Sequence, residues 1–164
     1  MNIPTKEECL EILKNNGTLS NIIEHCKTVA NLASKIADNL IKKGIKINKD
    51  LVIAGALLHD IERHKPNHIE SGTNLIKSLG YPEVAQIIKH HSLYQIEKEE
   101  VQPKTIEEKV VFYADKKIKG NKVTNLKERL DDAAKRHNVD LTNEYEYCKK
   151  IEKEIFGDKI PDLK

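Results

Sequence analysis

The sequence predicts an all-α fold, a single-domain bundle of about seven helices. Apolar residues recur at the three- and four-residue spacing of amphipathic helices along most of the chain. Helix-capping sequences separate these segments, and no run alternates apolar and polar residues as a half-buried strand would. A chain of 164 residues can bury roughly two thirds of its unfolded surface, so we treat residues 1–164 as one domain.

The composition predicts a cytoplasmic protein that binds neither membrane nor nucleic acid. The longest apolar run is too short to span a bilayer, and the acidic first residues contain no signal-peptide core. Three scattered cysteines, Cys9, Cys26 and Cys148, argue against a disulfide framework. The net charge of +2 mixes both signs along the chain, which argues against a nucleic-acid surface. The sequence does not indicate an oligomeric state.

Capping signals and periodicity predict the first two helices. The capping box Thr5–Glu8 opens a short helix that ends near Gly17. The second helix runs over Asn21–Lys43, and Gly44 ends it. His25 lies on or beside the buried stripe of this helix.

The third predicted helix has no polar face. Asn48 can cap it, and Leu51–Leu58 are all apolar or glycine, so the helix must lie in the core. It ends in His59 and Asp60. Burying this pair without partners costs several kcal/mol or more, so we expect a partner such as a metal ion.

Two helices follow a polar connection that ends at Pro66. Asn67 can cap a helix over His68–Leu79, and Pro82 suits the first turn of the next helix. That helix ends in His90–His91. Both helices therefore carry histidine at a terminus.

The rest of the chain predicts a loop and three more helices. Residues 92–104 form a charged loop that could close over a site. The capping box Thr105–Glu108 opens a helix that ends at Asp115, and helices over Thr124–His137 and Thr142–Phe156 close the chain. Of the lysines that follow Asp115, we expect Lys116 to turn toward the site and the others to face solvent.

Histidine and aspartate recur at buried helix ends. The positions are His25, His59, Asp60, His68, His90, His91 and Asp115, whereas His137 lies on a polar helix face. A histidine satisfied inside the core explains one such position but not all of them. Mixed imidazole and carboxylate ligands suit one or two divalent ions, such as Fe, Mn, Co, Ni or Zn, with Mg as a further candidate. Asp60 lies in the middle of the set and could bridge two ions.

The order of these residues resembles the HD-domain metal-dependent phosphohydrolases, in particular small stand-alone HDIG-like members. The resemblance covers residues 20–120 and implies an HD-type helical bundle. It implies one metal held by His25, His59, Asp60 and Asp115. It implies a second metal held by Asp60, His68 and His91, with His90 as a neighbouring candidate.

Local departures leave the branch of this superfamily open. One subgroup of the family has a glycine two residues after the His-Asp pair, where this chain has Glu62. Gly80-Tyr81-Pro82 resembles the signature of the cyclic-dinucleotide phosphodiesterase branch, but here it precedes His90–His91 instead of following it. The stretch Thr105–Asp115 resembles bacterial dinucleoside tetraphosphate hydrolases. The spacing from Asp60 to His68 resembles small archaeal HD proteins that open a cyclic phosphate on a pterin.

The resemblance predicts a metal-dependent phosphomonoesterase, phosphodiesterase or pyrophosphohydrolase acting on a nucleotide-like small molecule. Metal-activated water would be the nucleophile, with Asp60 as the shared ligand. Arg63 could bind phosphate through two hydrogen bonds, Lys116 could contact substrate, and His64 could donate a proton. The alternatives are a di-iron HD-type oxygenase, a non-catalytic nucleotide-binding or regulatory module, and a purely structural metal site.

Overall fold

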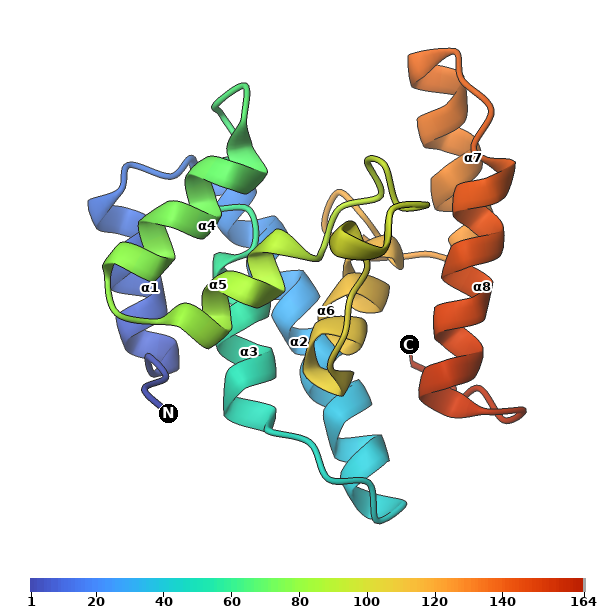
Figure 1. The fold of residues 1–164 in the computed structure, drawn as a ribbon, viewed down its shortest axis with the longest axis horizontal. Helices are drawn as coiled ribbons and strands as arrows, with labels where there is room; N and C mark the ends of the chain where they lie inside the picture. Colours follow the sequence, from blue (N-terminus) through green and yellow to red (C-terminus); the bar gives the residue numbers. More distant parts are fainter. Residues whose placement is uncertain (164) are drawn as a thin grey trace.

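The structure, a computed structural model, describes residues 1–163 and is almost entirely helical there. Its elements are eight α-helices, a short 3-10 helix and one two-stranded hairpin. Figure 1 shows α2, α3 and α6 in the middle, with α1, α4 and α5 on one side and α7 and α8 on the other. No described helix is both long enough and apolar enough to cross a membrane. The predicted all-α class is confirmed, whereas the hairpin was not predicted.

The first two helices begin as their sequences indicate. α1 (Lys6–Asn15) opens with a complete capping box: the Glu8 N–H donates to the Thr5 hydroxyl, and the Thr5 N–H donates to the Glu8 carboxylate. α2 (Ser20–Lys42) is amphipathic and longer than the other helices described here. Its buried face consists of Ile22, Cys26, Val29, Ala30, Leu32, Ala33, Ile36, Ala37 and Leu40.

α3 (Lys49–Leu58) lies at the centre of the fold. The Asn48 side chain caps it by accepting from the Leu51 N–H at 3.1 Å. The helix packs against α2, α5 (Pro82–Lys89) and α6 (Ile106–Lys116). Gly55 permits the close approach of α5, since a Cβ there would lie 2.6 Å from Ile87 Cδ1. Of the predicted apolar stretch only Ile53 is partly exposed, so the packing agrees with a helix that lies in the core.

Glu62 holds the connection between α3 and α4 (His68–Ser78). Its buried carboxylate accepts hydrogen bonds from Asn16 at 3.0 Å, Lys65 at 2.9 Å and Ser71 at 3.1 Å. These contacts tie the connection to the end of α1 and to α4. Asn67 occupies the predicted N-cap of α4, but its side chain makes no capping hydrogen bond.

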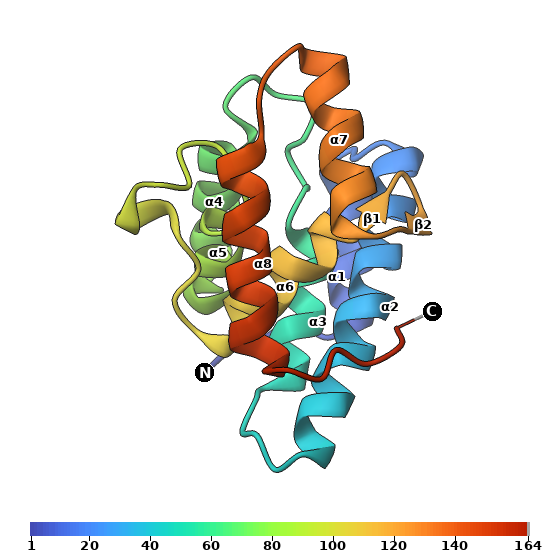
Figure 2. The same cartoon turned by 90° about the vertical axis from the view of Figure 1, so that its right-hand side faces the viewer.

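After residue 90 the chain forms a loop with a short 3-10 helix, then α6, and then a hairpin and two helices that pack against α6. The 3-10 helix η1 (Glu99–Val101) lies in the predicted loop before α6. After α6, β1 (Ile118–Lys119) and β2 (Lys122–Val123) form an antiparallel hairpin, followed by α7 (Leu126–His137) and α8 (Thr142–Phe156). Figure 2 shows this hairpin beside α7, next to α2. Strands of two residues are too short for any alternating pattern, so periodicity could not predict them.

Gly55→Ala should destabilise the protein even though alanine favours helix. The new methyl group would overlap Ile87 inside a packed core, which costs about 1–3 kcal/mol of unfolding free energy. Urea denaturation followed by circular dichroism measures this loss.

Gly72→Ala provides the matched control within α4. A Cβ at Gly72 would lie 3.4 Å from Ile88 Cγ2, which is an ordinary contact. The unfolding free energy of this variant should therefore stay unchanged or rise by up to about 1 kcal/mol. Equal stabilities of the two variants would contradict close packing of α3 on α5.

Candidate metal centre

Five of the predicted ligand residues come together where four helices meet. His25 lies in α2, His59 and Asp60 directly follow α3, His91 follows α5, and Asp115 lies near the end of α6. The convergence follows from the packing, because α2, α5 and α6 all contact α3. Segments far apart in the sequence therefore present their polar side chains to one place.

The ligand atoms form two overlapping groups. His25, His59 and Asp115 make one group, and His59, Asp60 and His91 make the other, each with its ligand atoms within 4.8 Å of one another. Asp115 Oδ1 lies 3.1 Å from His25 Nε2 and 3.3 Å from His59 Nε2. Such separations suit atoms that share an ion at about 2.0–2.2 Å from each.

The Asp60 carboxylate lies between these groups, with one oxygen toward each. Its Oδ2 is 3.6 Å from His25 Nε2 and 3.4 Å from His59 Nε2, while its Oδ1 is 3.5 Å from His91 Nε2. A carboxylate placed in this way can bridge two cations or hold one of them.

Backbone carbonyl groups fix the orientation of three imidazole rings. The Nδ1 of His25 lies 2.8 Å from the Gly120 carbonyl, that of His59 2.6 Å from Ala56, and that of His91 2.7 Å from Ile88. A carbonyl only accepts, so each Nδ1 must carry the proton and donate it. In the neutral form of each ring, Nε2 is then the acceptor that faces the carboxylates, the arrangement common among metal-binding histidines.

Two buried polar atoms of the cluster lack hydrogen-bond partners. They are His59 Nε2 and Asp60 Oδ1, which make no hydrogen bond within the part of the chain that the structure describes. Leaving buried polar atoms unpaired costs about 1–3 kcal/mol each, and more for charged groups. A cation ligated by both atoms would remove this cost, so the residues present fit a divalent metal.

The electrostatics of the cluster also favour a cation. Burial alone would raise the pKa of Asp60, but His59 and His91 hold that pKa well below its usual value. Burial acts likewise on Asp115, where Lys116 and the imidazoles keep the pKa well below its usual value. Burial lowers the pKa of His59, yet the carboxylates outweigh it and raise that pKa well above its usual value. Two ionised carboxylates in a buried place attract positive charge, which a metal ion can supply.

Lys116, predicted to contact substrate, is buried beside the candidate ligands Asp115 and His91. Its ammonium group donates to Asp115 Oδ2 at 2.9 Å and to the His91 carbonyl at 2.6 Å. The same group lies 4.6 Å from the centre of the Phe112 ring. Because these contacts occupy the ammonium group, its geometry fits a role in positioning Asp115 and His91.

His90, a predicted ligand, does not join the cluster. Its Nδ1 hydrogen-bonds to the Glu108 carboxylate, which also accepts from the Lys104 N–H and the Thr105 hydroxyl. Burial would raise the pKa of Glu108, but the His90 contact and the other donors lower it. The sequence showed Glu108 only as part of a capping box and gave no sign of this pairing.

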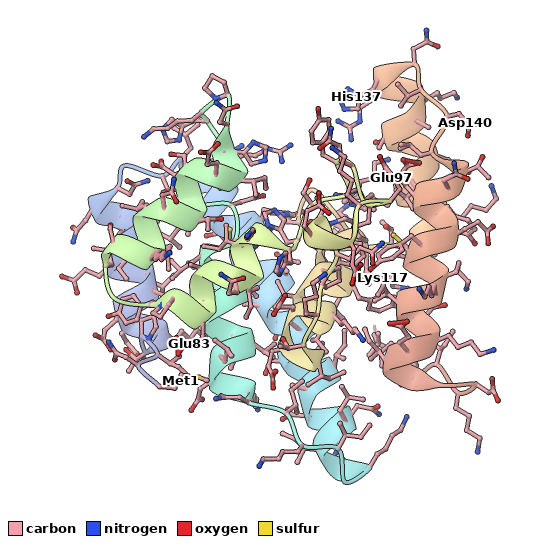
Figure 3. The ribbon with its side chains drawn as sticks, in the orientation of Figure 1. Met1, Glu83, Glu97, Lys117, His137 and Asp140 are labelled. Atoms are coloured by element: carbon pink, nitrogen blue, oxygen red, sulfur yellow. The ribbon has the colours of Figure 1, made fainter. Side chains whose placement is uncertain are left out.

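The remaining predicted residues lie at different places. His68 opens α4, and the fields of Arg63, Asp60 and His91 all act on its pKa, which burial lowers. His68 therefore lies near the cluster, although it belongs to neither ligand group. His64 Nε2 is 3.9 Å from the Glu62 carboxylate. Figure 3 shows His137 at the outer end of α7, where it is exposed as expected.

A pocket of about 620 Å³ opens from the metal centre. The buried Asp60 and Asp115 and the half-buried His25 form its inner part, and the exposed Arg63 also lines it, whereas His64 and Lys116 are not among its lining residues. The guanidinium group of Arg63 is exposed and has no hydrogen bond or ion pair among residues 1–163. It is therefore available to an anionic ligand.

The helical bundle and its cluster of histidines and aspartates define a class of protein. Residues 22–118, more than half of the chain, match the HD domain family, and the chain belongs to that family. This segment contains every predicted ligand residue. The predicted family is confirmed.

Three relatives show how far the similarity extends. An uncharacterized protein of Methanocaldococcus jannaschii is 34% identical over 96% of this chain and 97% of its own length. A tRNA (cytidine(56)-2'-O)-methyltransferase of Picrophilus torridus is also 34% identical, but this chain covers only 47% of that protein. A dihydroneopterin 2',3'-cyclic phosphate phosphodiesterase of M. jannaschii is 51% identical over 24% of this chain and 16% of its own length. No solved structure matches the chain.

Asp60→Ala should reduce bound metal at least about tenfold while helix content is retained, since this residue faces both ligand groups. Elemental analysis after dialysis, with circular dichroism of the same sample, measures both quantities. Asp131→Ala, which removes an exposed carboxylate from α7, is the control. Normal metal content in Asp60→Ala would show that Asp60 is not a ligand.

His91→Ala and His90→Ala should affect different quantities, the first the metal content and the second the unfolding free energy. Loss of His91 removes a ligand nitrogen and should lower metal content. Loss of His90 leaves the Glu108 carboxylate without its buried partner and should cost about 1–3 kcal/mol of unfolding free energy at unchanged metal content. Metal loss in His90→Ala at full folding would instead make His90 a ligand.

Proposed function

We propose that this protein is a metal-dependent phosphohydrolase that cleaves a phosphate ester or anhydride on a nucleotide-like small molecule. The observation that carries the proposal is the set of three fixed Nε2 atoms around the Asp60 and Asp115 carboxylates, with an open pocket beside them. Membership of the HD domain family and the partial similarity to a phosphodiesterase support it.

The roles of the residues follow from their positions. His25, His59 and Asp115 could hold one divalent ion, and Asp60 and His91 a second, with His68 close by. Bound divalent ions lower the pKa of coordinated water and offset charge on phosphoryl oxygens. Lys116 keeps Asp115 and His91 in place through its two hydrogen bonds.

Arg63 would bind the phosphate group of the substrate. It lies on the pocket wall shared with Asp60 and Asp115 and is free to form a bidentate contact with phosphate oxygens. A phosphate placed between Arg63 and the metal ligands would have its oxygens neutralised from both sides. His64 does not line this pocket, so we assign it no step.

A cyclic phosphodiester is the first substrate class to test. The relative from M. jannaschii is named for a 2',3'-cyclic phosphate, and the compact Asp60–His68 spacing resembles such enzymes. The methyltransferase name belongs to a protein about twice as long as this chain, so we transfer no activity from it.

The test compares metal-free and metal-loaded protein on bis(p-nitrophenyl) phosphate and on a panel of nucleoside cyclic phosphates. We expect hydrolysis that requires Mn, Fe, Co, Ni or Zn, that stops on chelation and that returns when the ion is restored. Arg63→Ala should lower kcat/KM at least about tenfold, the effect of one charge-assisted contact. Lys77→Ala, which removes an exposed positive charge from α4 at a position that does not line the pocket, is the control. Fully loaded protein that hydrolyses no member of the panel would contradict the proposal.

A further inference from the structure

The pocket continues well beyond the metal centre. Its outer part is lined by Lys119 and Asn121 of the hairpin and by Arg129, Asp132 and Arg136 of α7. The hairpin and α7 lie side by side in Figure 2. These residues are called the outer site below. The inner part and the outer site thus form one continuous cavity.

The outer site carries more positive than negative charge. Lys119 Nζ lies 3.4 Å from Asp132, and Arg136 Nε lies 2.9 Å from the same carboxylate. One carboxylate therefore serves two cations, while Arg129 adds a third. Glu24 also lines the pocket, but its carboxylate is 3.4 Å from Lys27. An excess of positive charge remains to attract an anion.

Arg129 is fixed in a way that leaves donors available. Its Nε donates to the Ile118 carbonyl at 2.9 Å, which holds the guanidinium against the hairpin. Its terminal amino groups have no hydrogen-bond partner in the described part of the chain. A fixed guanidinium with free donors on a pocket wall is suited to binding phosphate or carboxylate oxygens.

The hairpin connects the outer site to the metal centre. The Gly120 carbonyl at its turn accepts from Nδ1 of His25, whose Nε2 faces Asp115. Lys119 and Ile118, on the same hairpin, contact Asp132 and Arg129. A ligand in the outer site therefore lies at a set position relative to a group bound at the metal centre.

We propose that the outer site binds a second phosphate group of the substrate while the scissile phosphate lies at the metal centre. The inference rests on the proposed function and narrows it to nucleotide-like molecules that carry two phosphate groups. The second phosphate could be an ester on the sugar or part of an anhydride chain, and the test separates the two.

The test uses two chromogenic substrates that differ by one phosphate. Both thymidine 5'-(p-nitrophenyl phosphate) and its 3'-phosphorylated derivative release p-nitrophenol when metal-loaded protein hydrolyses the bond between phosphorus and the p-nitrophenyl oxygen. We expect a KM roughly tenfold lower for the 3'-phosphorylated ester, as one charge-assisted contact provides. If the outer site instead binds the second phosphate of an anhydride chain, the 3'-phosphate gives no gain. Thymidine 5'-diphosphate should then inhibit roughly tenfold more strongly than thymidine 5'-monophosphate. Either result supports the outer site, and its absence in both comparisons overturns the proposal.

Arg136→Gln and Arg129→Gln should abolish this preference. Arg136 is exposed on α7 and bonds only to Asp132 among the described residues, so its variant should fold even if loss of Arg129 disturbs the hairpin. Lys135→Gln removes the same charge from the neighbouring position of α7, which does not line the pocket, and should retain the preference. Equal effects of Lys135→Gln and Arg136→Gln would reduce the preference to overall charge and overturn the proposal.

A separate measurement keeps this inference distinct from the proposed function. If loaded protein hydrolyses neither these esters nor any member of the panel above, the proposed function fails. Calorimetry then compares binding of thymidine 3',5'-bisphosphate, thymidine 5'-diphosphate and thymidine 5'-monophosphate. Tighter binding of either diphosphorylated nucleotide, lost in Arg136→Gln, still supports the outer site. Equal binding of all three overturns it.

Discussion

The structure depends on partners for the two polar residues, His59 and Asp60, that directly follow a helix in the core. α3 brings His59 and Asp60 to buried positions, where they are only 1% and 7% exposed and little water can solvate them. Both side chains need partners, because burying a polar or charged group without one costs far more free energy than losing an apolar contact. The ends of α5 and α6 and one turn of α2 supply the surrounding nitrogen and oxygen atoms. The packing of the helices therefore also brings the candidate metal ligands together.

Buried polar contacts outside the cluster serve this arrangement. Lys116 joins Asp115 to the His91 carbonyl, and His90 with Glu108 joins the end of α5 to the start of α6. Glu62 joins the connection after Asp60 to α1 and α4. Each contact involves a segment that carries a candidate ligand residue, so several independent hydrogen bonds hold the positions of these residues. Such rigidity is what a metal site needs to keep its ligand atoms within a few tenths of an ångström.

The sequence was sufficient to predict the helices, which depend on local patterns, and the family, which depends on the order of histidines and aspartates along residues 20–120. The capping box at Thr5, the N-cap at Thr105 and the apolar stretch before His59 lie within a few residues of the features they predict. The roles of His90 and Lys116 could not be predicted in this way. His90 and His91 are adjacent and chemically identical, and only the position of α6 determines which one meets Glu108. The hairpin could not be predicted, because its strands Ile118–Lys119 and Lys122–Val123 are too short to show an alternation of apolar and polar residues.

The contact between α8 and α6 shows that the boundary of a family need not be the boundary of a stable unit. Residues 22–118 match the HD domain family, yet Ile151, Ile155 and Phe156 of α8 are buried in the core outside that range. The Tyr113 hydroxyl, within the matched segment, donates to Glu152 of α8 at 2.5 Å. A fragment trimmed to the matched segment would expose the apolar side of α6 to water and leave Tyr113 without its acceptor. The last helix thus acts as a cover without which the shorter fragment would aggregate.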